Sequence, residues 1–525
     1  MTESTGIHAQ TTEARLAWAV LLMIAGGKLA LHLATNHNYG YFIDEFYYLA
    51  CARHLDFGYV DHPPLIALTA WLATALFGES ARALRLLPAL FGAMTVFLSG
   101  VVAWRMGGGR FAQALAALAV TVSPLLLFMN TILSMNALDV LIWTLAAFIL
   151  VLLLNGGTQR LTPTHLWLLL GVVTGIGLQN KISVLFLGFG LGAGFVLTAH
   201  RRMLLTRGPW LAAAVAGVIF LPHVLWQIGH GWPTLEFMHN ATTLKNRPLS
   251  PIEFVAGQAL EAHPLNLVLL LLCLWWFMFS RQGRSYRIFG WAYIAIFAVF
   301  LVSGGKPYYM GPIYPLMFAG GACGTAGLLA RVRHSWPHVA VIFAMIAGGA
   351  VFAPMTLPVL PVEKFIAYQQ FLLGGTLASS ERKEVGLLPQ HFADMLGHEE
   401  RVALIAQVFQ GLPPQDRARC GIFCGEYCYA GAVDLFGGRF GLPSAISGQN
   451  SYWLWGPGSC DGEVLIVIGE GIDGDDLRET FREVHVARIF RHPYLMPCRN
   501  NLPIFVCRGI KRPLADVWQE TKKYE

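Results

Sequence analysis

The sequence is dominated by a series of long apolar runs that contain few charges. A helix needs about 20 consecutive apolar residues to cross the hydrocarbon core of a bilayer. Eleven runs of roughly this length follow one another through the first two-thirds of the 525-residue chain. They lie at residues 16–34, 83–104, 111–128, 137–155, 165–180, 182–199, 209–228, 264–281, 286–303, 307–330 and 337–353. The predicted fold class is a polytopic α-helical membrane protein with about eleven transmembrane helices.

Charged residues are scarce in these runs and return after them. They make up 13% of the whole chain, whereas an ordinary soluble domain carries about 25%. The sequence therefore predicts a membrane domain over residues 1–355 and a soluble domain over residues 356–525. The net charge of +6 is spread over many loops. Nucleic-acid binding requires a concentrated basic face, so this charge distribution argues against it.

Two features inside the apolar region need separate explanations. Residues 65–77 are apolar but shorter than the roughly 17 residues of the shortest spanning helices. They follow Pro63-Pro64 and precede Gly78, so we expect an interfacial or re-entrant helix. Lys28 lies inside the first run, and we expect its long side chain to extend to the lipid headgroups.

Arginine recurs in every second short connection between the runs. These residues are Arg105, Arg110, Arg160, Arg201, Arg202, Arg207, Arg281, Arg284, Arg287, Arg331 and Arg333. Because short cytoplasmic loops are enriched in Lys and Arg, these connections are predicted to face the cytoplasm. The other connections and, after eleven spans, the soluble domain then lie outside. In a bacterial inner membrane that side is the periplasm, where we expect the active site.

The soluble domain has the pattern of a mixed α/β unit. Residues 402–412 show helical spacing, and residues 463–469 form a continuous apolar run of strand length. A helical stretch is predicted at 475–484 and another strand at 504–509. No nucleophile and base stand out in this region. We interpret it as an acceptor-binding domain or a structural cover for the site.

Six of the nine cysteines lie in the soluble domain. They are Cys420, Cys424, Cys428, Cys460, Cys498 and Cys507. An exported domain resides in an oxidising compartment, so we expect disulfides among them. The regular spacing of the first three also leaves a metal site open.

The first outward connection holds the most unusual residues. Asp44 and Glu45 are adjacent soon after the first span, among the aromatic residues Phe42, Phe46, Tyr47 and Tyr48. A carboxylate at a membrane boundary can serve as a general base or a metal ligand. The alternative is a solvated helix start, since acidic side chains favour the first turn of a helix.

Further ionisable residues lie on the same predicted side. Asp139 is one turn inside the fourth span, where an acid is costly and indicates a functional site, with helix packing as the alternative. Lys181 and Lys306 lie outside, against the arginine bias. An ammonium group suits a lipid phosphate, although both side chains could instead extend to the headgroups.

These residues belong to segments that occur in a characteristic order. Residues 43–72 read IDEFYYLACARHLDFGYVDHPPLIALTAWL, and residues 130–143 read NTILSMNALDVLIW. GLQNKISVLFL and GGKPYYMGPIYPL follow further along the chain. In this order the segments resemble the membrane-edge loops of GT-C glycosyltransferases of the aminoarabinose-transferase and protein O-mannosyltransferase superfamily. Pieces of the tail such as YAGAVDLFG also resemble the tails of bacterial relatives, so the likeness covers most of the chain.

The resemblance implies a glycosyltransferase that takes a hexosyl or pentosyl-type sugar from a polyprenyl-phosphate donor. The acceptor would be a lipid, glycan or protein of the cell envelope. Asp44 takes the place of the principal catalytic acid, Glu45 that of its neighbour, and Asp139 that of the acid in the second outward loop. These three are the predicted catalytic residues.

The resemblance also implies a set of substrate-binding residues. Lys181 and Lys306 fall on basic positions associated with the donor phosphate, and Tyr308 and Tyr309 follow in the same segment. Aminoarabinose transferases have Lys before Pro-Pro, where this chain has His62 preceded by Asp61. The change argues against aminoarabinose as the sugar.

Two further matters remain open at the level of sequence. A divalent metal ion, held by Asp44 and Glu45, could offset the phosphate charge; otherwise no cofactor is expected. The main alternative function is a polyprenyl-linked substrate flippase or transporter, which also explains charges in the membrane. A membrane-anchored binding protein with the tail as its working part is a third possibility. Transporters usually contain internal repeats, and none is convincing here.

Overall fold

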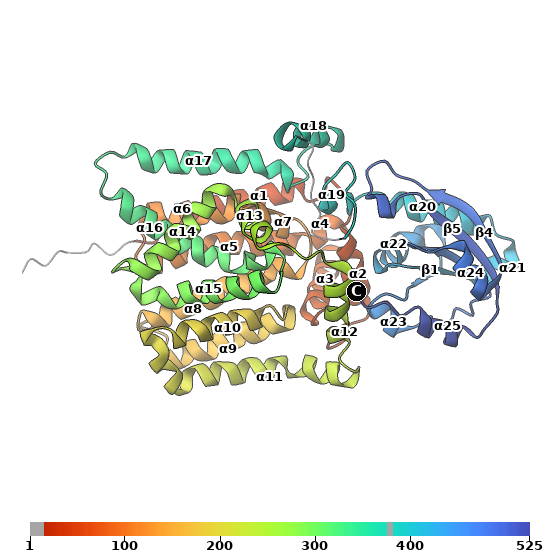
Figure 1. Cartoon of the computed structure of the whole chain (residues 1–525), viewed down its shortest axis with the longest axis horizontal. Coiled ribbons are helices and arrows are strands. Elements are labelled where there is room, and N and C mark those ends of the chain that lie inside the picture. The colour runs from red at the N-terminus through yellow and green to blue at the C-terminus, as the bar shows by residue number, and fades with distance from the viewer. Residues whose placement is uncertain (1–14, 375–381) are drawn as a thin grey trace, which may run out of the picture.

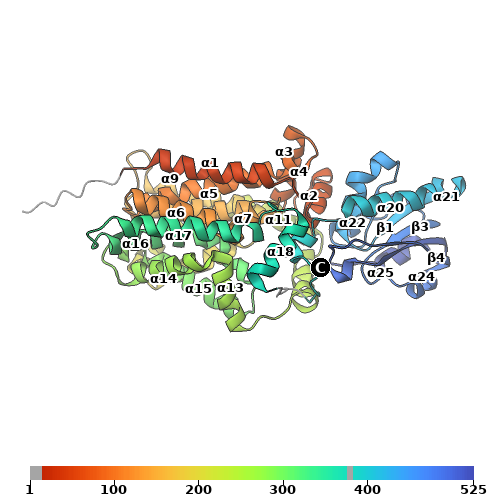
Figure 2. The same cartoon turned by 90° about the horizontal axis from the view of Figure 1, so that it is seen from above.

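The computed structural model describes residues 15–374 and 382–525. Helices form a bundle at one end of an elongated molecule, and a smaller unit of sheet and helices lies at the other end (Figure 1). Figure 2 shows the same division from above, with helices α2 and α22 lying where the two parts meet. We refer to residues 382–525 as the tail.

The bundle is built from the apolar runs identified in the sequence, and each of them contains helix. The helices are α1 (Trp18–Thr35), α5 (Leu86–Arg105), α6 (Arg110–Val122), α7 (Pro124–Met129), α8 (Met135–Leu154), α9 (Pro163–Asn180), α10 (Val184–Val196), α11 (Arg207–Gly229), α14 (Pro264–Phe279), α15 (Arg287–Val302), α16 (Tyr314–Leu329) and α17 (Trp336–Phe352). Within the described chain, seven helical segments are long and apolar enough to cross a membrane, or nine if each of two sharply bent pairs is one span. The protein is thus a polytopic helical membrane protein, and the count of eleven spans stays a prediction.

The third apolar run is broken where α6 ends and α7 begins. Pro124 has no N–H group, so the carbonyl of Val120 loses its helical partner. The Lys28 ammonium lies 3.5 Å from this carbonyl oxygen and 3.3 Å from that of Leu126. The Lys28 side chain is only 2% exposed. The expectation that it extends to the headgroups is therefore wrong, because it donates to carbonyl groups that the helix break leaves unsatisfied.

Short elements connect the long helices at the two ends of the bundle. Those nearer the tail are α2 (Ile43–Arg53), α3 (Leu65–Phe77), α4 (Ala81–Leu84), α12 (Pro233–Asn240), η2 (Ala241–Lys245), α13 (Pro251–Ala262), η4 (Pro307–Ile313), η5 (Ala353–Met355) and α18 (Val362–Leu373). The connections η1 (Ala199–Leu205) and η3 (Gly283–Tyr286) are joined by a 3.0 Å contact from His200 to the carbonyl of Ser285. The short helix predicted at residues 65–77 is α3.

The tail is one mixed sheet covered by helices. Its elements are α19 (Gln390–Ala393), α20 (His398–Gln410), α21 (Pro414–Arg419), β1 (Cys420–Cys424), α22 (Tyr427–Phe436), η6 (Gly437–Phe440), β2 (Ala445–Ile446), α23 (Ser451–Trp455), β3 (Val464–Ile468), α24 (Gly474–Thr480), β4 (Phe481–Phe490), η7 (Pro497–Arg499), β5 (Leu502–Ile510) and α25 (Leu514–Glu520). The strand order is β2-β1-β3-β5-β4. Strands β2, β1 and β3 are parallel, and β5 is antiparallel to β3 and β4.

Two predicted strands and one predicted helix coincide with β3, β5 and α20. The helix predicted at 475–484 ends earlier, because Phe481 begins β4. Val484 and Val486 pair with Cys507 and Phe505 of β5, and β-branched residues favour such pairing over a helix.

The tail and the first outward connection share one hydrophobic core. Phe46 and Leu49 of α2 cluster with Ile405, Tyr429 and Ile466 of the tail, and all are buried. A Cβ atom at Gly431 of α22 would lie 2.7 Å from the backbone oxygen of Phe46. Glycine therefore lets the two helices approach backbone to backbone. The division of the chain into domains at residue 355 stays a prediction, but apolar packing is continuous across it.

The cysteines of the tail do not form disulfides. All nine cysteines lie in the described part of the chain, and all are free thiols. Cys424 and Cys507 are buried within the sheet, and Cys428 is buried in α22. Burial raises the pKa of Cys428 and Cys507 to about 12, which disfavours the reactive thiolate. The disulfide prediction is wrong because these thiols serve as small apolar packing groups.

Candidate active site

The two adjacent acids Asp44 and Glu45 lie in the first turn of α2, and their side chains point in different directions. Successive residues of an α-helix do not face one another, because 3.6 residues complete one turn. Asp44 is partly exposed, whereas Glu45 is fully buried. The pair therefore divides into one carboxylate that faces the tail and one that faces the helical bundle.

Glu45 is held by a buried ion pair. Both of its oxygens accept hydrogen bonds from the Arg85 guanidinium, at 2.9 and 2.7 Å. The backbone N–H groups of Phe42 and Leu133 donate to it at 2.8 Å each. Arg85 also donates to the carbonyl of Asn36 at 2.6 Å. These contacts favour a positioning role for Glu45, whose predicted catalytic role stays a prediction.

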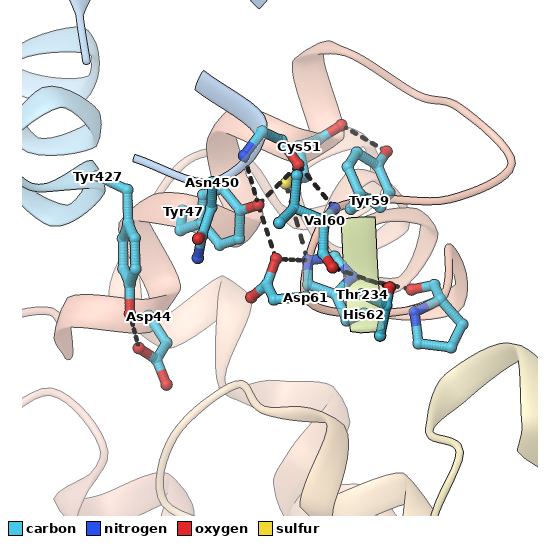
Figure 3. A network of polar contacts seen from close by, with 12 residues as sticks. Asp44, Tyr47, Cys51, Tyr59, Val60, Asp61, His62, Thr234, Tyr427 and Asn450 are labelled. Atoms are coloured by element: carbon cyan, nitrogen blue, oxygen red, sulfur yellow. Dashed lines mark hydrogen bonds and ion pairs between the residues drawn. The ribbon is translucent and has the colours of Figure 1, made fainter. Parts of the chain in front are cut away.

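Asp44 faces the tail across the interface. The hydroxyl of Tyr427 at the start of α22 donates to its Oδ1 at 2.8 Å, and Figure 3 shows the two side chains pointing toward each other. Burial and the nearby Asp44 carboxylate raise the pKa of Tyr427 well above its usual value, so the phenol stays a donor. Asp44 also lines a cavity of about 270 Å³ between α2 and the tail. It is the predicted catalytic acid, and it borders open space.

Asp61 and His62 lie between α2 and α3, in the same connection as Asp44. Tyr47 donates to Asp61 at 2.8 Å, and its hydroxyl also lies 2.8 Å from Ser451 of the tail (Figure 3). The His62 side chain is fully buried, with one ring nitrogen 2.9 Å from the carbonyl of Pro63. Asp61 is partly exposed near the site, whereas His62 packs beneath it. Their predicted substrate contacts stay predictions, and burial does not favour the one assigned to His62.

Asp139 and Lys181 meet across α8 and the start of α10. Ser183 donates to both oxygens of the buried Asp139, at 2.8 and 2.7 Å. The Lys181 ammonium donates to Asn136 at 2.6 Å and lies near enough to Asp139 to interact electrostatically. Lys181 is partly exposed. The two predicted site residues therefore lie together, with Asp139 behind Lys181.

Aromatic residues join this group to Asp44. The Lys181 ammonium lies 5.9 Å from the ring centre of Tyr308, which packs edge-on against Tyr309 at 4.7 Å. Burial raises the pKa of Tyr48 in α2 well above its usual value, and the nearby Asp44, Asp61 and Tyr308 add to this effect. Lys306, directly before η4, is partly exposed in the same segment. Four connections that are far apart in sequence, and that were predicted to face outward, thus converge at one end of the bundle.

The metal site predicted at Asp44 and Glu45 stays a prediction, and in the structure the two side chains contact different groups. Among residues 15–374 and 382–525, no group of three or more His, Cys, Asp or Glu side chains is arranged to hold a metal ion. Glu45 directs both oxygens to a guanidinium, and Asp44 turns to a phenol. The two carboxylates therefore do not form a joint ligand set, and no step of the chemistry below depends on a metal.

Sequence analysis did not identify two residues of the site, Arg85 and Tyr427. Arg85 carries a recognisable signal, since an arginine at the start of a spanning helix, on the side predicted to face outward, opposes the charge bias. Tyr427 lies 383 residues from the acid it contacts, and its own segment gives no sign of that contact.

Comparisons of the chain with known proteins indicate which class of protein it resembles. The chain matches the family model described as dolichyl-phosphate-mannose-protein mannosyltransferase over residues 61–226. Lipid A galacturonosyltransferase RgtD from Rhizobium johnstonii is 28% identical over 275 residues, which are 50% of this chain and 55% of that protein. The chain thus spans about half the length of the curated relative that it matches.

Solved structures share the fold over more of the chain. ArnT from Cupriavidus metallidurans bound to undecaprenyl phosphate has a TM-score of 0.61 and 16% identity, covering 94% of this chain and 98% of that one. The oligosaccharyltransferase from Archaeoglobus fulgidus, tethered with an acceptor peptide, has a TM-score of 0.50 and 12% identity, covering 82% and 63%. Such identities establish the fold alone.

The fold defines the protein as a polytopic membrane protein of GT-C architecture. The family match and the curated relative, both glycosyltransferases, agree with this fold in supporting a likeness to the GT-C glycosyltransferase superfamily.

Proposed function

We propose that the protein transfers a sugar from a polyprenyl-phosphate donor to a hydroxyl group of an envelope acceptor at the outer face of the inner membrane. One observation carries the proposal: four connections between helices bring an acid, a lysine and two tyrosines packed edge-on together at one end of the bundle. A base, a cation for the leaving phosphate and aromatic faces for a sugar are the parts that such a transfer requires.

The residues divide naturally between the two substrates. Lys181 lies between membrane helices, where its ammonium can neutralise the donor phosphate while the prenyl chain stays in lipid. Each buried CH₂ of that chain contributes about 0.8 kcal/mol to membrane binding, so the donor reaches the site from the bilayer. Lys306 and Tyr308 lie in the neighbouring connection and extend this donor side.

Asp44 is the group placed to activate the acceptor. The acceptor oxygen forms a bond to the anomeric carbon, and its proton passes to the Asp44 carboxylate. The bond between the anomeric carbon and the phosphate oxygen breaks, and polyprenyl phosphate leaves with the bonding pair. Attack opposite to the leaving group inverts the anomeric configuration. Lysine charge stabilises the leaving phosphate as it gains negative charge.

The first substrates to test follow from the relatives. Undecaprenyl phosphate is the molecule bound in the ArnT structure, and lipid A and galacturonate are named in the curated relative. We therefore propose undecaprenyl-phosphate galacturonate as the first donor and lipid A as the first acceptor. The sequence match covers half of each chain, so both choices belong to the proposal.

The test is transfer by purified protein in lipid nanodiscs, with Asp44→Asn compared with the unchanged protein. The substitution retains side-chain size, so folding should persist while turnover falls by about 100- to 10,000-fold, the usual contribution of a general base. Asp476→Asn, at an exposed acid of α24, is the matched control and should transfer normally. Near-normal turnover in Asp44→Asn refutes the base assignment. Movement of the intact donor across the bilayer without any transfer would instead favour a flippase.

A further inference from the structure

The cavity between α2 and the tail is polar on both sides. Phe42 and Asp44 line it from α2, and Glu426, Tyr427 and Lys523 line it from the tail. Its volume of about 270 Å³ accommodates a sugar ring but not a folded protein segment. None of Lys181, Asp139 and Tyr308 lines it, so the cavity borders Asp44 without including these proposed donor-side residues.

Most charged groups of the cavity wall already bind one another. Arg499 pairs with Asp394 and, at 2.8 Å, with Glu470. Lys383 also pairs with Glu470, at 2.9 Å. Positive charge near the cavity is therefore neutralised by carboxylates, which makes this a poor site for a free phosphate.

Glu426 differs from the other acids. It is only 6% exposed, yet its Oε1 lies 3.6 Å from the Lys523 ammonium, which is too long for a hydrogen bond. Its Oε2 accepts one hydrogen bond, from the backbone N–H of Glu470 at 3.0 Å. A carboxylate can accept about four. A buried acid that is left incompletely bonded next to a cavity needs a donor from a ligand or from water.

Glu426 and the residue that contacts Asp44 are neighbours in the chain. The backbone N–H of Tyr427 donates to Gln449 at 2.8 Å, which fixes the turn that begins α22. Tyr427 then reaches Asp44, while Glu426 lines the same cavity. A molecule in the cavity can therefore contact Glu426 at one point and place a hydroxyl at Asp44 at another.

We propose that this cavity binds the sugar headgroup of the acceptor, with Glu426 accepting a hydrogen bond from a hydroxyl or amino group of that sugar. This rests on the function proposed above and adds to it the acceptor class: a neutral or amino sugar, recognised by the tail. Aromatic faces of Phe42 and Tyr427 flank the cavity, as is usual for sugar rings.

The first experiment separates acceptor binding from donor chemistry. Glu426→Gln should raise KM for lipid A about tenfold, because one hydrogen bond to a charged group is weakened. KM for the donor should stay unchanged, and so should the slow hydrolysis of the donor in the absence of lipid A. Glu479→Gln, at an exposed acid of α24, is the control. An unchanged acceptor KM, or an equal rise in donor KM, overturns the inference.

The second experiment does not depend on turnover. Hydrogen–deuterium exchange of the full-length protein is measured with and without a soluble glucosamine disaccharide, the headgroup type of lipid A. Protection is expected at the start of α22 in the unchanged protein and should be lost in Glu426→Gln. Absence of protection in the unchanged protein overturns the inference, even if transfer occurs. Protection without any transfer supports it and counts against the proposed function instead.

Discussion

The helical bundle and the tail hold α2 by different kinds of contact. On the bundle side, Glu45 and Arg85 form a fully buried ion pair that also binds backbone groups of two connections. On the tail side, the contacts are apolar packing and hydroxyl hydrogen bonds, from Tyr427 to Asp44 and between Ser451 and Tyr47. The bundle fixes the backbone of α2, whereas the tail contacts the side chains of the acids that face the site.

From this difference we expect stability to depend on the face of α2 that contacts the bundle. Under the proposed function, turnover depends on the opposite face of α2. Loss of a bundle contact should unfold the site, because a buried charge is left unpaired. Loss of a tail contact should leave the fold intact but change the orientation of a reacting group. Four substitutions or conditions test the distinction, from the largest expected effect to the smallest.

Glu45→Gln should cause the largest loss of stability. It leaves the buried Arg85 guanidinium without a counter-charge, and breaking such a pair costs about 3–5 kcal/mol. Thermal unfolding in detergent measures the effect. Glu520→Gln removes the partner of Arg512 in an exposed pair and should change stability by less than about 1 kcal/mol. Equal stabilities of the two variants would contradict the role assigned to the bundle side.

Tyr427→Phe should reduce kcat while the protein stays folded. The lost hydrogen bond to a carboxylate is worth about 1.5–3 kcal/mol, which corresponds to roughly 10- to 150-fold in rate if it acts in the transition state. Without this donor the ionised form of Asp44 is less stabilised, so the acid limb of kcat/KM should move to higher pH.

Tyr452→Phe is the matched control for that experiment. Tyr452 donates to Asp434 at 2.7 Å within the tail, so the same type of bond is lost away from Asp44. Its pH profile should match that of the unchanged protein. The positioning role of Tyr427 fails if the two variants show the same kcat and the same acid limb.

Gly431→Ala should separate the tail from α2. The added methyl group would meet the backbone oxygen of Phe46 at 2.7 Å, and overpacking of this kind typically costs about 1–3 kcal/mol. Turnover should fall together with stability, because Tyr427 lies on the displaced helix. Gly438→Ala meets nothing within 4 Å and should be neutral. A neutral Gly431→Ala would show that the close approach of the helices is unimportant.

The smallest of the four expected effects is a change of stability with pH that is caused by Glu426 of the tail. Burial, with the neighbouring Glu470 carboxylate adding to it, raises the pKa of Glu426 to about 7, against the opposing charges of Lys523 and Arg499. The folded protein therefore holds a proton that the unfolded chain has lost, and stability should fall as pH rises from about 5 to 7.5. Arg499 and Lys383 lower the pKa of Glu470 to about 2, so Glu470 stays ionised throughout this window.

Glu426→Gln should flatten that decline, since the substituted side chain does not titrate. Thermal unfolding of both proteins across the same pH range provides the measurement. A decline of equal slope in the variant would assign it to another group.

Much of the bundle follows from the sequence because each spanning helix is determined locally. Hydropathy located every apolar run, and Pro63-Pro64 and Gly78 marked the two ends of α3. The break between α6 and α7 was not predicted. The error at Lys28 has a non-local cause. The Lys28 ammonium contacts carbonyl groups at the break between α6 and α7, about 95 residues further along the chain. A hydropathy profile does not show which side chain will contact those carbonyl groups.

The sequence singled out residues that the structure brings close together, but not which of them are buried and which are exposed. Asp44 and Glu45 are equivalent in sequence, and the helix phase relative to Arg85 decides which of them is buried. Lys181 and Asp139 were expected on one side, and the structure places them together. The contribution of the tail was not predictable, since the contact between Tyr427 and Asp44 depends on tertiary packing alone.

The shared core of α2 and the tail also constrains how the chain is made. The apolar face of α2 is synthesised 383 residues before the helix that covers it. At about 5–20 residues per second this interval lasts roughly 20–80 s. During that time aromatic surface stays exposed at the membrane edge, where unfinished chains are prone to aggregate. The contact between Tyr427 and Asp44 can form only after α22 has been synthesised, so under the proposed function a chain that stalls before β1 should lack activity.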